Sequence, residues 1–191
     1  MLLVIRRSVI CLFMMIILTG AIYPLFITGI GKVCFSKQCQ GSLIVHGDKV
    51  VGSELIGQQF DDPKYFWSRP SSTSPVPYNA SASAGSNLGP TNPTLINAVQ
   101  ERIAKLKAAN PENKLPVPVD LVTASGSGLD VHISPAAAKY QLSRVARVRG
   151  LTITQLQQVV ARHTQGRQLG FLGEPRVNVL TLNLTLDESI K

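Results

Sequence analysis

An uninterrupted apolar run near the start of the chain most constrains what this sequence can fold into. From Ser8 to Gly31, 24 residues pass without an Asp, Glu, Lys, Arg or His. About 20 helical residues, rising roughly 1.5 Å each, cross a hydrocarbon core roughly 30 Å thick. A cleaved signal peptide is the alternative, but its apolar region spans only about 7–15 residues. We therefore predict an uncleaved transmembrane helix over residues 8–30, kinked by Pro24.

Flanking charge orients this helix. Arg6 and Arg7 precede the run, whereas Lys32 and Lys37 follow it, so the positive-inside rule is nearly balanced. An arginine pair this close to the N-terminus is typical of a signal-anchor whose N-terminus stays in the cytoplasm. The domain beyond it would then be extracytoplasmic, which excludes nucleic acid as a partner despite a formal net charge of +8. We predict a cytoplasmic N-terminus, a transmembrane helix, a juxtamembrane segment and a periplasmic domain, at residues 1–7, 8–30, 31–42 and 43–191.

Small residues interrupt the otherwise bulky span. Gly20 and Pro24 lie within it, and small or weakly polar residues let neighbouring helices approach closely. We therefore interpret Gly20 and Pro24 as contacts for partner helices. Just past the span, Cys34 and Cys39 can close a local disulfide if that side is oxidising, or remain two free thiols. A metal site is not indicated, because Cys-x4-Cys lacks a second pair of ligands.

The rest of the chain alternates β-like and helical patterns. Gly47-Asp48 between two β-rich runs predicts a hairpin. Six prolines within residues 61–94 predict an irregular but ordered loop. Helices are predicted at 93–109, from Ser134-Pro135 to Arg149, and from Thr152 to Gly166, with a β-like segment at 117–124 and an alternating, half-buried strand at 180–187. This order predicts a small α+β domain with a mixed sheet.

The segment from Ser125 to His132 is the nearest approach to an active-site motif. The chain lacks G-x-x-x-x-G-K-[S/T], G-x-S-x-G and H-E-x-x-H. Consecutive amides in a Gly/Ser loop can cradle a phosphate, a glycine-permitted turn needs no ligand, and a hydrolase could use Ser127 and His132. We assign no catalytic residue and no metal ligand. The cofactor-binding candidates are Ser125, Gly126, Ser127, Gly128 and Asp130.

Aromatic and basic residues supply the candidates for partner contact in the domain. Three aromatics and an arginine fall within residues 65–69, and these types are enriched at interfaces, although core packing is the alternative. Residues 131–173 contain no Asp or Glu, so their basic side chains form a solvated face or meet an acidic partner. The predicted contacts are Tyr65, Phe66, Trp67, Arg69 and Arg144.

Several blocks together resemble one family over nearly the whole chain. They read GSELIGQ at 52–58, YFWSRPS at 65–71, GSNLGP at 85–90, VDLVTASGSGLD at 119–130, RVA at 144–146 and FLGEPRVNVL at 171–180. On these residues the chain resembles the C subunit of bacterial Kdp-type potassium-transporting ATPases. Two features are atypical, because Val131 stands where the family usually has proline, and the Cys34/Cys39 pair is not a hallmark.

The resemblance implies a single-pass subunit of an inner-membrane complex with a periplasmic domain. Its implied partners are a channel-like A subunit, an ATP-hydrolysing B subunit, a very small F subunit and the lipid bilayer. The implied role is non-catalytic: the subunit stabilises the assembly and is proposed to raise the ATP affinity of the pump subunit. It implies no cofactor of its own, with ATP reached only through that pump subunit. The alternatives from other classes are a membrane-anchored hydrolase and a free-standing periplasmic binding module.

Overall fold

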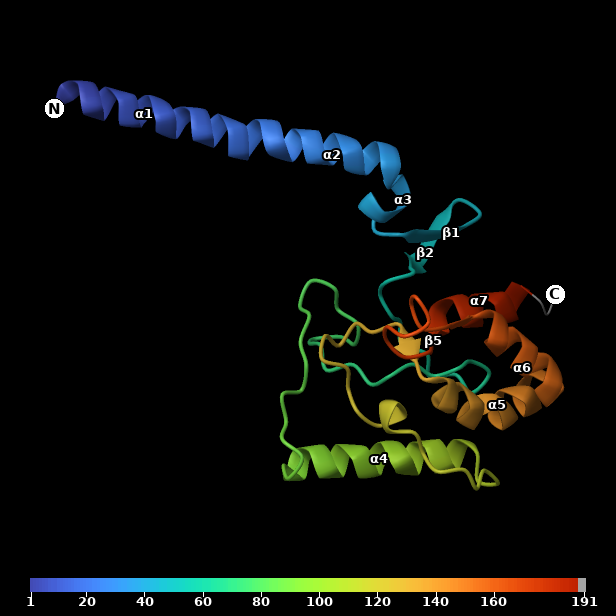
Figure 1. The fold of residues 1–191 in the computed structure, drawn as a ribbon. Helices are drawn as coiled ribbons and strands as arrows, with labels where there is room; N and C mark the ends of the chain where they lie inside the picture. The colour runs from blue at the N-terminus through green and yellow to red at the C-terminus, as the bar shows by residue number, and fades with distance from the viewer. Residues whose placement is uncertain (189–191) are drawn as a thin grey trace. The chain divides into compact units, whose positions relative to one another are not determined.

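A computed structural model describes residues 1–188 of the chain (Figure 1), so the last three residues of the predicted periplasmic domain lie outside the described part. The chain divides into two compact units, Met1–Leu43 and a second that begins at Ile44. The first unit is helical, whereas the second combines helices with small sheets. This combination confirms the predicted α+β class.

The N-terminal unit consists mainly of one long apolar helix. Its parts are α1 (Leu2–Ile17), the π-helical turn η1 (Leu18–Ile22) and α2 (Tyr23–Cys34), followed by the short helix α3 (Ser36–Cys39). The stretch Leu2–Cys34 is long and apolar enough to cross a membrane. The disturbance expected at Pro24 appears as η1, just before it. Pro24 has no N–H to donate and its ring crowds the carbonyl four residues earlier, which a wider π turn accommodates.

A β-hairpin and an irregular segment come next. β1 (Leu43–His46) and β2 (Lys49–Ser53) pair across a turn in which Gly47 has a φ of 61°. That left-handed conformation suits glycine, and the hairpin prediction is confirmed. Residues 57–92 then run without a helix or strand, which confirms the irregular segment predicted at 61–94 up to the start of the helix at Pro93. Side-chain hydrogen bonds order them; for example, the Ser71 hydroxyl accepts the Tyr78 N–H at 2.9 Å.

Three helices begin at caps that the sequence encodes. They are α4 (Pro93–Ala109), α5 (Pro135–Arg149) and α6 (Ile153–Arg162). The Ser134 hydroxyl accepts the Ala137 N–H at 3.0 Å, and Thr152 and Gln155 form a reciprocal capping box. Gly150 ends α5 with a φ of 66°. The three predicted helices are confirmed, although α6 ends before the predicted glycine.

The C-terminal segment is a helix, and the predicted strand is wrong. α7 (Val179–Glu188) follows directly after the last strand. Its buried residues Val179, Leu182 and Leu186 recur at intervals of three and four, which is the period of one helix face. Leucines four positions apart satisfy both a helical and an alternating pattern, so the sequence alone could not separate the two.

The predicted β-like segment at 117–124 is also wrong. It forms the 3-10 turn η2 (Val119–Leu121). There the Asp120 carboxylate accepts the Ser134 N–H at 2.7 Å and the Ser134 hydroxyl at 3.2 Å. The turn is therefore tied to the start of α5 by a side chain, and its backbone is paired within the turn, where the Leu121 N–H donates to the Pro118 carbonyl at 3.1 Å.

The second sheet is antiparallel rather than mixed. β3 (His132–Ile133), β4 (Thr164–Gln165) and β5 (Arg176–Asn178) lie in the order β3-β5-β4, and both ladders are antiparallel. β3 and β4 run in the same direction, as their α5–α6 connection allows. β5 lies between them, because the ten-residue loop 166–175 after β4 reverses the chain into the gap. The parallel pairing implied by the prediction therefore never forms.

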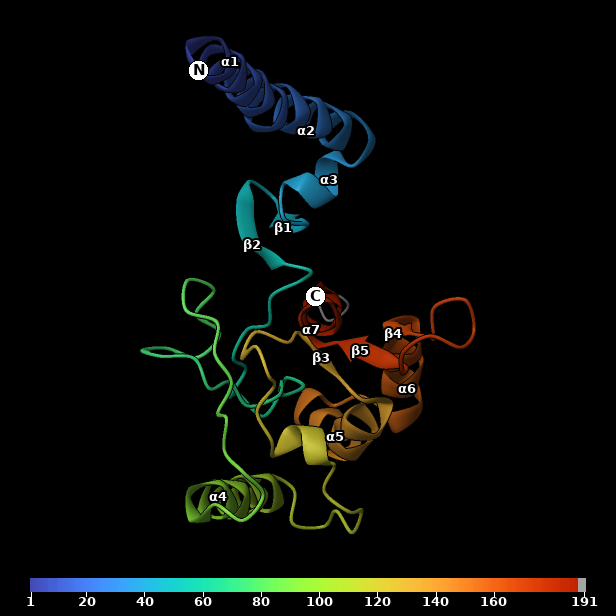
Figure 2. The same ribbon diagram turned by 60° about the vertical axis from the view of Figure 1, so that its left-hand side comes forward.

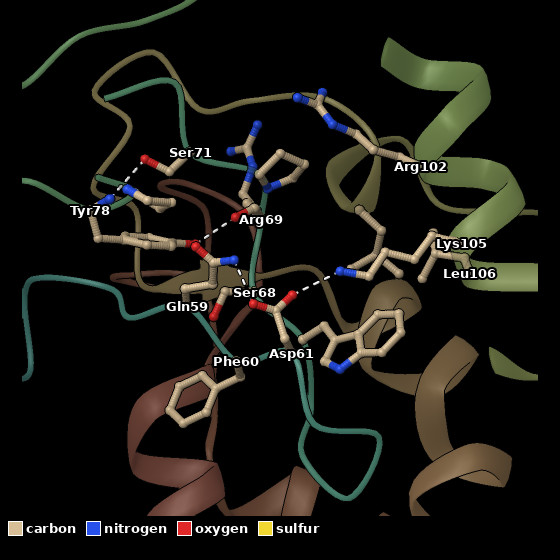
Figure 3. A pocket seen from close by; sticks show the side chains of 14 residues that line it. Gln59, Phe60, Asp61, Ser68, Arg69, Ser71, Tyr78, Arg102, Lys105 and Leu106 are labelled. Atoms are coloured by element: carbon tan, nitrogen blue, oxygen red, sulfur yellow. Dashed lines mark hydrogen bonds and ion pairs between the residues drawn. The ribbon is translucent and has the colours of Figure 1, made fainter. Parts of the chain in front are cut away.

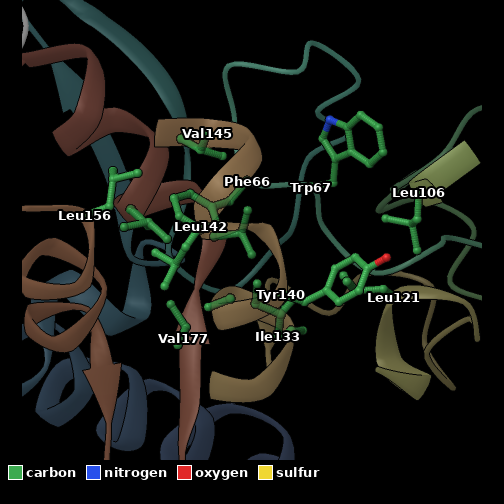
Figure 4. Packing of buried hydrophobic residues seen from close by; sticks show 14 of the residues in the cluster. Phe66, Trp67, Leu106, Leu121, Ile133, Tyr140, Leu142, Val145, Leu156 and Val177 are labelled. Atoms are coloured by element: carbon green, nitrogen blue, oxygen red, sulfur yellow. The ribbon is translucent and has the colours of Figure 1, made fainter. Parts of the chain in front are cut away.

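The core joins the irregular segment to the sheet and the helices (Figure 4). Phe66, Val145, Leu156, Val177 and Leu182 are each 0% exposed, and they come from five different stretches of the second unit. Phe66 belongs to the irregular segment, so that segment contributes to the core although it has no regular structure. This placement also fixes the neighbouring positions, where the predicted contacts Tyr65, Trp67 and Arg69 lie.

Candidate functional site

Two amide side chains hold the Phe66–Trp67 backbone inside the domain. Gln141 on α5 accepts the Trp67 N–H at 2.7 Å and donates to the Trp67 carbonyl at 3.1 Å. Asn183 on α7 accepts the Phe66 N–H and donates to the Phe66 carbonyl, both at 2.9 Å. A buried irregular segment must satisfy its backbone groups, and here side-chain amides do what a neighbouring strand would do. We call these two residues the amide clamp.

Arg144 on α5 completes this buried arrangement. Its guanidinium donates to Gln141 Oε1 at 2.6 Å and to the Tyr65 carbonyl at 3.0 Å, and it stacks 4.1 Å from the Trp67 ring centroid. Burial lowers the pKa of Arg144 to about 10, which leaves it charged at neutral pH. For Phe66, Trp67 and Arg144 the structure therefore favours packing inside the domain over contact with a partner. These three residues are only 0%, 9% and 2% exposed, and Arg144 stacks on the Trp67 ring.

Tyr65 faces outward from the same segment. Its hydroxyl donates to Asp187 at 2.7 Å, and the Arg149 guanidinium donates to the other oxygen of that carboxylate, also at 2.7 Å. The hydrogen bond with Asp187 raises the pKa of Tyr65. Tyr65 thus links the irregular segment to α5 and α7, and its predicted partner contact remains a prediction.

Arg69, Asp130 and His132 form the most organised charged cluster. Arg69 Nη1 lies 3.1 Å from Asp130 Oδ2, while Asp130 Oδ1 accepts the His132 N–H at 3.0 Å and lies 3.4 Å from His132 Nδ1. Burial alone raises the pKa of Asp130, but the hydrogen bonds from His132 and Arg69 outweigh it and lower the pKa to about 2. Asp130 and His132 are close in the sequence, whereas Arg69 joins them from 61 positions before Asp130.

The Ser125–Gly128 loop is tied down by neighbouring segments. The Ser127 carbonyl accepts the Ala84 N–H at 3.0 Å, and the Gly128 carbonyl accepts the Ser71 hydroxyl at 2.7 Å. Gly128 has a φ of 68°, and a Cβ there would lie 2.6 Å from the Ala84 carbonyl oxygen. Its own N–H donates to Ser125 within the loop at 3.3 Å. These contacts favour the glycine-permitted turn over a phosphate cradle.

The serine and histidine of the hydrolase alternative have different partners. The Ser127 hydroxyl accepts the Leu129 N–H at 3.1 Å, whereas the His132 ring faces Asp130. A nucleophile needs its base within hydrogen-bonding reach, so this geometry does not favour that alternative. Within residues 1–188, no group of three or more His, Cys, Asp or Glu side chains could hold a metal ion.

A basic hollow of about 250 Å³ lies beside Trp67 (Figure 3). Lys105 Nζ lies 2.8 Å from Asp61 Oδ1 and 5.3 Å from the Trp67 ring centroid, and Arg102 Nη1 donates to the Val122 carbonyl. The hydrogen bond with Lys105 lowers the pKa of Asp61, and burial lowers that of Arg102.

The sequence prediction missed this hollow. Arg102 and Lys105 lie three positions apart on α4, beside its apolar stripe, and that spacing could have revealed them. Tyr78 also lines the hollow, with its pKa raised to about 12 by burial. Tyr78 has no comparable signal, because its left-handed φ of 58° and its hydrogen bond to the Arg69 carbonyl depend on how the loop folds.

The N-terminal unit presents its predicted contact residues openly. A Cβ added at Gly20 would meet no atom within 4 Å, and Pro24 lies in the first turn of α2. The Thr28 hydroxyl donates to the Pro24 carbonyl at 2.7 Å, so this polar group is satisfied within the helix. Cys34 and Cys39 are free, exposed thiols that end α2 and α3. The predicted disulfide is thus not formed in this structure, and its formation in the cell remains a prediction.

An apolar helix able to span a membrane is joined to an α+β unit whose charged clusters mainly hold its own backbone, and this arrangement fits a membrane protein. Residues 5–188 match the family model KdpC: K+-transporting ATPase, c chain. The chain belongs to this family, and it is therefore a subunit of a potassium-transporting ATPase complex.

Curated relatives agree over almost their full length. The chain is 60% identical over 182 residues to the potassium-transporting ATPase KdpC subunit of Sorangium cellulosum (strain So ce56), covering 95% of this chain and 96% of the relative. It is 59% identical over 186 residues to the subunit of the same name in Dechloromonas aromatica (strain RCB), covering 97% of each. Against that of Herpetosiphon aurantiacus the identity is 63% over 172 residues, covering 90% of this chain and 89% of the relative.

Proposed function

We propose that this chain is a non-catalytic subunit that stabilises the assembly of a high-affinity, ATP-driven potassium uptake complex in the bacterial inner membrane. The observation that carries the proposal is the helix Leu2–Cys34, whose most apolar stretch is 0% buried by the rest of the chain. A helix with bulky side chains and a glycine whose Cβ position is open has a surface that can pack on other transmembrane helices. Its partners are a channel-like A subunit, an ATP-hydrolysing B subunit and a small F subunit.

Replacing residues 8–30 with a polyleucine span tests this proposal. Membrane insertion should persist, because the span stays apolar, but co-purification with the other subunits should fall. The matched control restores Thr19, Gly20, Pro24 and Thr28 within the polyleucine span and should recover assembly. Full assembly and potassium uptake with the unrestored polyleucine span would contradict a packing role for the helix.

The second unit lies on the periplasmic side in this proposal. An effect on the ATP affinity of the pump subunit would then be indirect, because ATP is cytoplasmic. It would act as an allosteric coupling through the span, for which free energies of about 1–3 kcal/mol are typical. The tied-down Ser125–Gly128 loop supports this indirect route over direct contact with the nucleotide. Comparing the KM for ATP of complexes that carry the native or the polyleucine span would measure the coupling.

A further inference from the structure

The loop that joins β4 to β5 carries an exposed apolar tip. The tip is formed by Leu169, Phe171 and Leu172, whose side chains are 83%, 69% and 48% exposed. The exposed fraction of Leu169 is larger than that of every other large apolar side chain described beyond residue 34. Figure 2 shows the loop extending outward beyond β4 and α6. We call these three residues the apolar peg. Single exposed apolar residues are ordinary, but three gathered on one projecting loop indicate a contact surface.

The peg is presented by an ordered loop. Gln168 and Leu172 exchange two backbone hydrogen bonds of 2.9 Å, and Arg167 Nη2 lies 2.9 Å from both carboxylate oxygens of Glu174. Gly170 and Gly173 take φ values of 82° and 75° within the turn. The loop is closed by its own contacts, so the apolar side chains are already positioned before any partner binds. Such preorganisation lowers the entropic cost of association.

A second cavity with basic side chains lies at the base of this loop, separate from the hollow beside Trp67. Arg162 at the end of α6 and Arg176 at the start of β5 line one cavity of about 390 Å³ together with Gln165. Arg176 Nε donates to Gln165 Oε1 at 3.1 Å. Glu54 and His163 also line the cavity, and burial lowers the pKa of His163. The two arginines therefore outnumber the one carboxylate of the cavity, which gives it a positive charge at neutral pH. We call this cavity the basic socket.

We propose that the apolar peg inserts into an apolar pocket on the extracytoplasmic surface of another subunit of the complex, while an acidic side chain beside that pocket binds in the basic socket. The inference rests on the proposed function, because it names the surface through which the domain joins the assembly. An apolar centre with a charged rim is the arrangement of a protein interface. A lipid surface fits less well, because anionic membranes recruit clusters of about 4–8 basic residues, and the only charges on the peg loop itself are the paired Arg167 and Glu174.

The test compares full-length variants co-expressed with the other subunits. Phe171→Ser should lower co-purification at least tenfold, whereas Leu115→Ser, which alters a 47% exposed leucine outside the loop, should leave it unchanged. Arg176→Glu should also lower co-purification, because it would repel the partner carboxylate. Unfolding of each purified chain, followed by Trp67 emission, should match the native chain, since neither Phe171 nor Arg176 is in the core.

The outcomes separate the inference from the proposed function. Suppose that the Phe171→Ser chain co-purifies as well as the native chain, whereas the chain with the polyleucine span no longer assembles. This result would overturn the role of the apolar peg and would keep the proposed function. An intact complex in cells that lack the chain would overturn the proposed function itself. Phe171→Trp in the chain reconstituted alone offers a second measurement. Quenching of its emission by brominated lipids would assign the loop to the bilayer and overturn the inference.

Discussion

Gln141→Leu should be one of the most destabilising single substitutions in the second unit. The side chain is 1% exposed, and it serves the Trp67 N–H, the Trp67 carbonyl and the Arg144 guanidinium. Leucine has a similar volume but would leave both Trp67 backbone groups without this partner and would remove one hydrogen bond of the Arg144 guanidinium, which would still donate to the Tyr65 carbonyl. Each backbone group left unpaired costs about 1–3 kcal/mol. Allowing for relaxation, we expect the free energy of unfolding to fall by about 3–5 kcal/mol, from a total that is typically about 5–15 kcal/mol.

Urea unfolding provides the assay, because the chain has a single tryptophan, and that residue is Trp67 inside the affected cluster. With an m-value of about 2 kcal/mol/M, the midpoint should fall by roughly 2 M. Gln157→Leu is the matched control, since Gln157 is exposed on α6 and should change stability by less than about 0.5 kcal/mol. A loss below about 1 kcal/mol for Gln141→Leu, similar to the control, would refute the amide clamp as a stabilising element.

Three further predictions concern charge, topology and catalysis. The pKa of Asp130, about 2, lies below its unfolded value of about 4, so its stabilising effect is present above pH ~4 and is lost as the pH falls toward 2. In urea unfolding, Asp130→Asn should therefore reduce the loss of stability between pH ~4 and pH 2. A loss of stability as steep as that of the native chain would contradict the ion pair. Maleimide labelling of intact cells, with and without reductant, tests the predicted disulfide between Cys34 and Cys39. If the bond forms outside the cytoplasm, both thiols should be labelled only after reduction, and labelling without reductant would exclude the bond. The purified chain should release no phosphate from ATP and cleave no ester above buffer, and turnover lost in Ser127→Ala would refute a non-catalytic role.

The sequence predicted those elements whose determinants are local. The cap at Ser134, the capping box at Thr152 and the turn at Gly47 each depend on a few neighbouring residues, and all three occur in the structure. The apolar helix was predictable for the same reason, because its length and lack of charge suffice. Local chemistry therefore predicted where most elements begin, and less reliably where they end.

The predictions that failed depended on distant contacts. Trp67 reads as an interface residue until Gln141, 74 positions later, is seen to bind its backbone. Asn183, 117 positions from Phe66, looked like the polar face of a strand, whereas in α7 it points inward to satisfy a buried segment. Nothing within a short window of sequence encodes such pairs, so both the core assignment of Phe66 and Trp67 and the helical state of α7 required the fold.

The π turn at Leu18–Ile22 has a consequence for how the N-terminal helix meets its neighbours. An α-helix advances about 100° per residue, and a π turn accommodates roughly one additional residue, so it rotates the helical phase by about that amount. Side chains of α1 and α2 that follow one heptad repeat in sequence therefore point in different directions on either side of the turn. A straight neighbouring helix would meet one stripe of residues before Leu18 and another after Ile22. Deleting a single residue within the turn should bring the two stripes back into one line and redirect every contact on one side of it.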